Sequence, residues 1–256
     1  MGTEDIQYGD RYCAYLDILG FRELVNALSA DLEKVKSLKR VLQRVHTPLG
    51  GALYLTVRSQ SISDAVALSA DPTIEALEKM LESIALLALD LLTEGFFVRG
   101  AVVKGPLYHD NHMVFGKALV DAYHYESEIA KYPRVIVVQR VREDILTEKP
   151  DLVRRLLKPA DDGPMYIDVL RTVREIGRIS RNPNVKLMDW QQYQHTQFLK
   201  IGGLLQNKFA DSMDNPRHFE KVKWFAKYWN ETIDNGRLEY RKVLGAGLET
   251  VKSGKG

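Results

Sequence analysis

Hydrophobic and polar positions along the chain follow two periods, one typical of β-strands and one typical of helices. Residues 11–17 form an apolar run that ends in an acid, which predicts a buried strand. Residues 52–69 hold two β-rich runs around a Ser/Asp turn, and this pattern predicts a hairpin. Residues 30–45 carry apolar side chains at helical spacing, and residues 72–93 predict a helix that changes from amphipathic to buried.

The middle of the chain continues this alternation. It predicts a strand over 96–105, a hairpin that ends at Gly116, a helix over 117–130, a strand over 134–138, a short helix over 141–150 and a last strand over 165–170. From about 187 to 250 the pattern is mostly helical and charged. Because helices connect some strands while hairpins join others, the sequence predicts an α+β sandwich followed by a helical extension.

Composition narrows the classes of protein that fit this pattern. The 256 residues are 45% hydrophobic, enough for one substantial core or for one domain with an appended subdomain. The net charge of +2 argues against a nucleic-acid coat protein, so no nucleic-acid partner is expected. The longest apolar run, 84–92, is too short to span a bilayer, and the N-terminus lacks the apolar stretch of a secretory signal.

Cysteine usage indicates the compartment. Cys13 is the single cysteine, which excludes an intramolecular disulfide framework and a cysteine-rich zinc site. A reducing cytosol is the natural environment of such a chain. We therefore expect a soluble, cytoplasmic protein with no membrane partner, and an inert thiol at Cys13.

Two acids are the first candidates for chemistry. Asp17 ends the first predicted strand, and Asp64 lies at the tip of the first predicted hairpin. Carboxylates at strand ends can share divalent cations, while the backbone amides of Leu19, Gly20 and Phe21 at a helix start can hold phosphate. Taken singly, Asp17 is also explained as a helix N-cap and Asp64 as a turn former.

Five segments in this order and spacing resemble the class III nucleotidyl cyclases. YLDILGFRE resembles the first metal-binding motif of that family, and SISDAVALS resembles the second. The remaining three segments are RGAVVKGPL, VFGKALVDAYHYES and RVIVVQRVREDIL, so that the resemblance covers residues 10–147. It implies a cyclase-like α/β sandwich as the catalytic domain over 1–170, with a mainly helical extension over 171–256.

The resemblance also implies roles for single residues. Asp17 and Asp64 would bind two Mg²⁺ or Mn²⁺ ions with help from the backbone carbonyl of Ile18. The amides of Leu19, Gly20 and Phe21 would hold the β- and γ-phosphates, and Arg99 matches an arginine that touches phosphate. The family builds its sites between two subunits, so the resemblance implies a homodimer with active sites at the interface.

The sequence departs from the family at four positions. Gln60 and Met113 stand where adenylate cyclases carry the lysine and aspartate that read adenine. Val120 and His124 replace the catalytic asparagine and arginine. His124 shares a helix face with Lys117 and Asp121, so that Lys117 or a protonated His124 could stabilise charge on the transferring phosphate. A solvated helix face explains the same pattern equally well.

A sequence that keeps both metal-binding acids but lacks the residues that recognise a purine base resembles the bacterial antiphage pyrimidine cyclases of the Pycsar system. This resemblance implies UTP as substrate, cyclic UMP as the product, and a separately encoded effector that responds to the product. Tyr54 lies on the strand face of Gln60 and could stack on a pyrimidine, although it could equally be a core aromatic. Arg99 offers only donors, which suit a uracil carbonyl better than the amino group of cytosine. A cytidylate cyclase and a catalytically silent nucleotide-binding domain stay open as alternatives.

Other polar and aromatic residues have simpler explanations. His109 and His112 flank Asp110 in a predicted loop that is expected to be solvated rather than to bind a metal. The three tryptophans of the C-terminal region are expected to be packing anchors rather than stacking platforms for bases: Trp190, Trp224 and Trp229.

Overall fold

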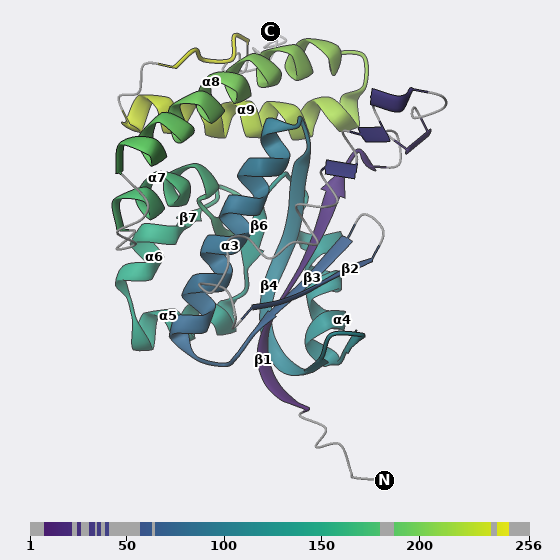
Figure 1. Ribbon diagram of the computed structural model, residues 1–256, viewed down its shortest axis with the longest axis vertical. Helices are drawn as coiled ribbons and strands as arrows, with labels where there is room; N and C mark the ends of the chain where they lie inside the picture. The colour runs from purple at the N-terminus through teal and green to yellow at the C-terminus, as the bar shows by residue number, and fades with distance from the viewer. Residues whose placement is uncertain are drawn as a thin grey trace, which may run out of the picture.

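Figure 1 shows the computed structural model, which describes residues 8–21, 25–26, 31–33, 35–36, 39–40, 57–62, 65–179, 187–236 and 240–245. The described residues form an eight-stranded mixed sheet in the order β2-β3-β1-β4-β6-β8-β7, with β5 paired to β4 outside this path. The strands are β1 (Gly9–Leu19), β2 (Val57–Ile62), β3 (Ala65–Ala70), β4 (Phe97–His109), β5 (Val114–Phe115), β6 (Val135–Val137), β7 (Leu157–Pro159) and β8 (Met165–Ile167).

Helices cover both faces of the sheet, which confirms the predicted α+β architecture. One face carries α4 and the π-helical turn η2, and the other carries α3 with the helices that surround it. Figure 1 shows α8 and α9 lying side by side across the end of α3. The bounds are α3 (Ile74–Thr93), α4 (Lys117–His124), η2 (Tyr125–Ile129), α5 (Gln139–Glu148), α6 (Asp151–Leu156), α7 (Val169–Ile179), α8 (Leu187–Asp211) and α9 (Pro216–Gly236).

Strand β1 is central because both of its edges are paired. It runs antiparallel to β3 on one side and to β4 on the other. Its side chains alternate between the two faces of the sheet, as the period of two requires. Tyr12, Ala14, Leu16 and Ile18 enter the larger core on the α3 face, whereas Cys13 enters the smaller core under α4.

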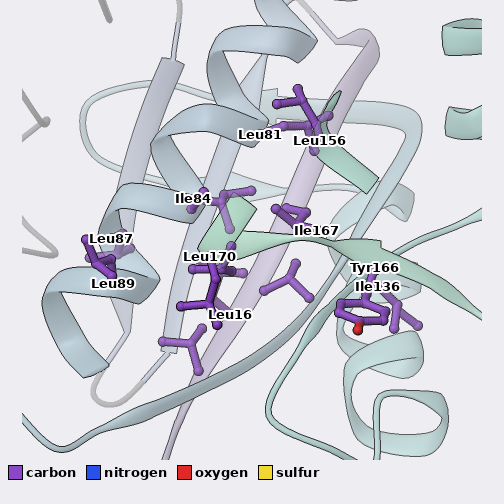
Figure 2. Packing of buried hydrophobic residues seen from close by; sticks show 14 of the residues in the cluster. Leu16, Leu81, Ile84, Leu87, Leu89, Ile136, Leu156, Tyr166, Ile167 and Leu170 are labelled. Atoms are coloured by element: carbon purple, nitrogen blue, oxygen red, sulfur yellow. The ribbon is translucent and has the colours of Figure 1, made fainter. Parts of the chain in front are cut away.

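The larger core is built around α3. Thr73 begins this helix as its N-cap, with its side-chain oxygen accepting a hydrogen bond of 3.3 Å from the amide of Ala76. Side chains of α3, of β1 and of the segment 156–170 meet in this core (Figure 2). Burial on this scale removes apolar surface from water and is the main favourable term for the fold.

The C-terminal helices belong to the same buried cluster. Phe198 and Trp229 are buried together with residues of α3 and β4. Asn230 exchanges two hydrogen bonds with the backbone of Val243, at 2.8 and 3.0 Å, and so fixes the chain after α9. The predicted division into 1–170 and 171–256 stays a prediction, because a shared core does not decide whether either part folds alone.

Two expectations about secondary structure need correction. The last predicted strand, 165–170, ends at Ile167, and α7 begins at Val169. The pattern also missed α6 and β7, which are short elements. The region from about 187 to 250, predicted to be mostly helical, is helical over α8 and α9 and non-helical at 212–215 and 240–245.

The remaining predicted elements are present where the chain is described. The strand at 11–17, the hairpin of β2 and β3, the helix at 72–93 and the hairpin of β4 and β5 are confirmed. Of the predicted helix at 30–45, the residues 32–33, 35–36 and 39–40 are described and are helical. Within the described residues, no helix combines the length and the apolar character that a membrane span requires.

Candidate active site

Asp17 lies near the end of the central strand, between the two neighbouring strands. Its backbone is in register with Ala65 of β3 and with Arg99 of β4. Its side chain is 24% exposed, and its Oδ2 lies 3.6 Å from Nη2 of Arg99. The sheet therefore places an accessible carboxylate and a guanidinium side by side on the face that carries α4.

Two glycines allow the backbone around Asp17. Gly20 has φ of 84° directly after β1, a left-handed conformation that side chains disfavour. A Cβ atom on Gly100 would lie 2.5 Å from the carbonyl oxygen of Tyr15. Glycine at position 100 therefore permits β4 to approach β1 next to the pair of Asp17 and Arg99.

Arg99 is shared between two carboxylates. Its Nε donates a hydrogen bond of 2.5 Å to Oε1 of Glu126, and its Nη2 forms an ion pair with the same oxygen. Glu126 is only 2% exposed. Burial raises the pKa of Glu126 and the charge of Asp17 acts in the same direction, while the Arg99 guanidinium opposes both.

Sequence reasoning missed Glu126, although a signal for it exists. Ala118, Ala122, Glu126 and Ala130 are spaced by four residues, and all are buried. An acid on the apolar stripe of a helix must find a partner inside the fold, because an unpaired buried charge is costly. Here that partner is Arg99.

The face of α4 that carries Lys117, Asp121 and His124 is directed toward the surface of the described structure. Nζ of Lys117 lies 2.6 and 2.8 Å from the two carboxylate oxygens of Asp121, so the predicted spacing of four residues brings them together. His124 is exposed, with its ring centroid 6.0 Å from that of Tyr125. Lys117 thus pairs with Asp121 on the same face of α4.

Gln60 and Met113 come together in space, although 53 positions separate them in the sequence. Nε2 of Gln60 donates a hydrogen bond of 2.9 Å to the carbonyl oxygen of His112, the neighbour of Met113. Met113 is 50% exposed. Oε1 of Gln60 is buried without a hydrogen-bond partner among the described residues.

The loop between β4 and β5 has its own hydrogen bonds. The carboxylate of Asp110 accepts from the amides of His112 and Met113, each at 2.8 Å, and these bonds lower the pKa of Asp110 to about 2. Nδ1 of His109 lies 2.8 Å from the hydroxyl of Ser69, and burial lowers the pKa of His109 to about 4. His109 is buried rather than solvated as expected, and no cluster of three metal-ligating side chains occurs within the described residues.

The structure does not describe the side chains of three residues to which the sequence gives an expected role. Tyr54 and Asp64 are not among the described residues, and neither is the side chain of Trp190. The other two tryptophans are packing residues, as predicted: Trp229 is fully buried, and Trp224 stacks on Tyr132 with ring centroids 5.6 Å apart.

Around Asp17, the donor atoms are of the kind that Mg²⁺ and Mn²⁺ bind. Carboxylate and backbone carbonyl oxygens are hard ligands, and Asp17 and Ile18 supply one of each at the end of β1. Leu19 ends the strand, Gly20 is exposed, and Phe21 packs its ring against the larger core. The local residues therefore fit a divalent cation.

Cys13 lies on the same strand face, where burial raises the pKa of its thiol to about 12 and keeps it protonated at neutral pH.

A cavity of about 220 Å³ lies away from these residues, between the β7–β8 hairpin and α9. The charged groups that line it have partners: Lys158 lies 2.9 Å from Glu231, Lys227 lies 3.5 Å from Asp161, and Asp162 accepts two hydrogen bonds, at 2.6 and 2.7 Å, from Arg134 behind the lining. The aromatic rings of the lining already contact cationic side chains, since Cζ of Arg134 lies 5.8 Å from the ring centroid of Tyr166. These contacts explain the cavity as part of the hairpin's own packing.

No family model matches the sequence, and no curated protein matches it. Solved structures do resemble it. The adenylyl cyclase CyaB from P. aeruginosa is 16% identical with a TM-score of 0.41, over 63% of this chain and 93% of that one. The catalytic core of a rhodopsin-guanylyl cyclase with converted specificity, in complex with ATPalphaS, is 14% identical with a TM-score of 0.42, over 62% and 95%. A class III adenylyl cyclase-like ATP-binding protein from Pseudomonas aeruginosa is 11% identical with a TM-score of 0.38, over 55% and 37%.

Proposed function

We propose that this chain is a nucleotidyl cyclase that converts UTP to 3′,5′-cyclic UMP and pyrophosphate with two divalent ions. One observation carries the proposal: Asp17 is in register with Ala65, and Asp64 directly precedes Ala65 in the chain. Consecutive Cα atoms are about 3.8 Å apart, and on this basis we propose that Asp64 lies across from Asp17 on the neighbouring strand. Two acids so placed are the ligands that a pair of Mg²⁺ or Mn²⁺ ions requires.

The reaction needs few groups from the protein. The ribose 3′-oxygen forms a bond to the α-phosphorus, the bond from that phosphorus to the bridging oxygen breaks, and pyrophosphate leaves while the 3′-proton passes to solvent. The bound ions would supply acidification of the 3′-hydroxyl and neutralisation of the triphosphate. Asp17, Asp64 and the carbonyl of Ile18 hold the ions, and the amides of Leu19, Gly20 and Phe21 hold the outer phosphates.

A pyrimidine base is favoured by what surrounds Gln60. The amide of Gln60 donates a hydrogen bond to the carbonyl of His112. Because Gln60 and Met113 are both uncharged, they do not provide the charged pair that reads adenine. Tyr54 is proposed to stack on the smaller base and fill the space of a purine. We assign Arg99 to a phosphate contact, because its guanidinium lies beside Asp17. The choice of UTP over CTP then rests on the resemblance to the Pycsar cyclases.

The substrate assay tests this proposal directly. With Mn²⁺ and each of the four ribonucleoside triphosphates, UTP is expected to give far more cyclic product than ATP or GTP. The margin over CTP is expected to be about tenfold to a hundredfold, because it depends on hydrogen bonds at one edge of the base. Chromatography of the products measures all four rates, and efficient cyclic AMP synthesis would exclude the pyrimidine assignment.

A catalytically silent nucleotide-binding domain is the second candidate. It is favoured by Val120 and His124, which stand where the family has its catalytic asparagine and arginine. Val120 is 66% exposed and offers no polar group for phosphate. In the proposed enzyme, Lys117 or His124 supplies the positive charge instead. Tight UTP binding without any product in the same assay would favour the silent domain.

We further propose that a second copy of this chain covers the outer face of α4. Large apolar side chains are exposed along this segment and the elements that flank it, which is unusual for a surface that faces only water. The same helix carries Lys117 and His124, so a partner seated there would place its Asp17 near them. The exposed apolar residues are Met113, Phe115, Val120, Tyr123, Tyr125 and Ile129.

Replacing Val120 with glutamate is expected to produce a monomer without cyclase activity, because a charge would be buried in the interface. Leu199→Glu provides the control, since Leu199 is 55% exposed on α8, which packs on the opposite side of the sheet. Sedimentation velocity measures the oligomeric state of both variants. A wild-type protein that is a fully active monomer at nanomolar concentration would contradict the shared site.

The cellular role follows from the resemblance to antiphage cyclases. We propose that the enzyme acts in the cytoplasm on phage infection, and that cyclic UMP activates a separately encoded effector. Cyclic UMP can be measured by mass spectrometry in infected cells that express the chain. A level that does not rise on infection would remove this role and leave the enzymatic proposal untouched.

A further inference from the structure

Glu126 is a buried acid that the proposed reaction does not use. It lies in η2, where the amide of Ala130 donates to the carbonyl oxygen of Tyr125 at 3.0 Å, a hydrogen bond across five residues. Such π-helical turns are rare and are often found at functional sites. The turn continues the buried stripe of Ala118 and Ala122, and this directs the Glu126 side chain toward the sheet and Arg99.

The three charged groups are unequally spaced. Oε1 of Glu126 is bonded to both Nε and Nη2 of Arg99, whereas Oδ2 of Asp17 lies 3.6 Å from Nη2. A separation of 3.6 Å is too long for a hydrogen bond. Arg99 is therefore held mainly by Glu126, although Asp17 is close enough to compete for it.

Asp17 and Glu126 compete for the Arg99 guanidinium, and the outcome decides whether the Asp17 carboxylate is available to a cation. A bidentate pair with the guanidinium would occupy both carboxylate oxygens, because the donor fork of arginine matches a carboxylate. With Glu126 ionised, the three groups carry a net charge of −1, which attracts a divalent cation. With a neutral side chain at 126, the net charge would be zero and Arg99 would turn to Asp17.

We propose that Glu126 is a positioning residue, which restrains Arg99 and so leaves the Asp17 carboxylate able to bind a divalent cation. The inference rests on the metal-binding role given to Asp17 in the proposed function. It assigns Glu126 no contact with substrate or metal. Its effect is on cation affinity and not on the rate of the bound complex.

The test is Glu126→Gln, which keeps the size of the side chain and removes its charge. Free Mn²⁺ is measured by electron paramagnetic resonance as protein is added, so that the readout does not depend on turnover. The Kd for Mn²⁺ is expected to rise about tenfold, the effect of one lost charge-assisted contact. The Mn²⁺ concentration for half-maximal activity should rise in parallel, with kcat at saturating Mn²⁺ within about threefold of wild type. Glu128→Gln is the control, an exposed acid in the same turn that should bind Mn²⁺ like wild type.

A double variant separates positioning from a merely structural role. If Glu126 acts through Arg99, the combination of Glu126→Gln with Arg99→Gln should restore Mn²⁺ binding, since the competitor for Asp17 is removed. A double variant that binds as weakly as Glu126→Gln alone overturns the inference, as does a Glu126→Gln variant with unchanged affinity. Should Glu126→Gln fail to fold, Arg99→Gln decides alone: affinity equal to or above wild type supports the inference, and weaker binding overturns it.

Failure of the inference and failure of the proposed function give different results. A wild-type protein that binds no Mn²⁺ and forms no cyclic nucleotide overturns both. A wild-type protein that binds Mn²⁺ and makes cyclic UMP, beside a Glu126→Gln variant of the same affinity, overturns only the role of Glu126.

Discussion

Asp17→Ala is expected to lower cyclic UMP formation by about 10³-fold or more while the protein stays folded. In the proposed enzyme, a ligand shared by both ions would contribute several kcal/mol to the stability of the transition state. Folding should survive, because Arg99 keeps its contacts with Glu126 when Asp17 is removed. Asp64→Ala is expected to have the same effect. Turnover is measured from pyrophosphate release, and folding from the thermal melting curve.

Asp10→Ala is a matched control on the same strand. Asp10 is an exposed acid of β1 whose carboxylate lies 3.0 Å from Arg140. Its loss should change neither turnover nor stability by a measurable amount, since exposed ion pairs are weak. The two-metal assignment would be wrong if Asp17→Ala and Asp64→Ala both kept near wild-type turnover.

Trp229→Ala is expected to cost about 3–5 kcal/mol of unfolding free energy. The side chain is fully buried, and its ring packs against Phe198 with centroids 5.4 Å apart. Its Nε1 donates a hydrogen bond of 3.1 Å to the carbonyl of Arg241, so the substitution also releases the chain after α9. Urea unfolding followed by circular dichroism measures the change.

Leu199→Ala controls for the loss of apolar surface alone, because this leucine of α8 is mostly exposed. It should change stability by less than about 0.5 kcal/mol. The shape of the Trp229→Ala transition also tests the predicted boundary after residue 170. One transition means that the helices fold with the sheet, whereas two transitions mean that the C-terminal part unfolds separately.

Periodicity predicts the elements that bury one whole face. The apolar alternation of β1 and the helical spacing of α3 are strong signals, because each element packs along most of its length. The end of β8 could not be predicted in this way. Asp168 accepts hydrogen bonds from the amide of Arg171 and from the hydroxyl of Tyr228, 60 positions away, and together they start α7 directly after the strand.

The candidate site could be predicted only where a motif is local in sequence. Asp17 and Gly20 lie three positions apart at the end of one strand. The pairing of Lys117 with Asp121 needs only one helical turn. The contact between Arg99 and Glu126 joins residues 27 positions apart and depends on how η2 packs on β4. Such contacts follow from tertiary packing, which no single segment of sequence encodes.

The alternation of β1 limits the kinds of change that this gene can accept. Its even-numbered side chains face α3 and its odd-numbered ones face α4, while both edges of the strand are paired. Inserting or deleting one residue before Asp17 within the strand would exchange the two faces beyond that point. The acid would enter the apolar core, and Leu16 or Ile18 would take its place. A substitution changes one side chain of this strand and leaves the others on their faces, whereas a single-codon insertion or deletion would remove function and stability together.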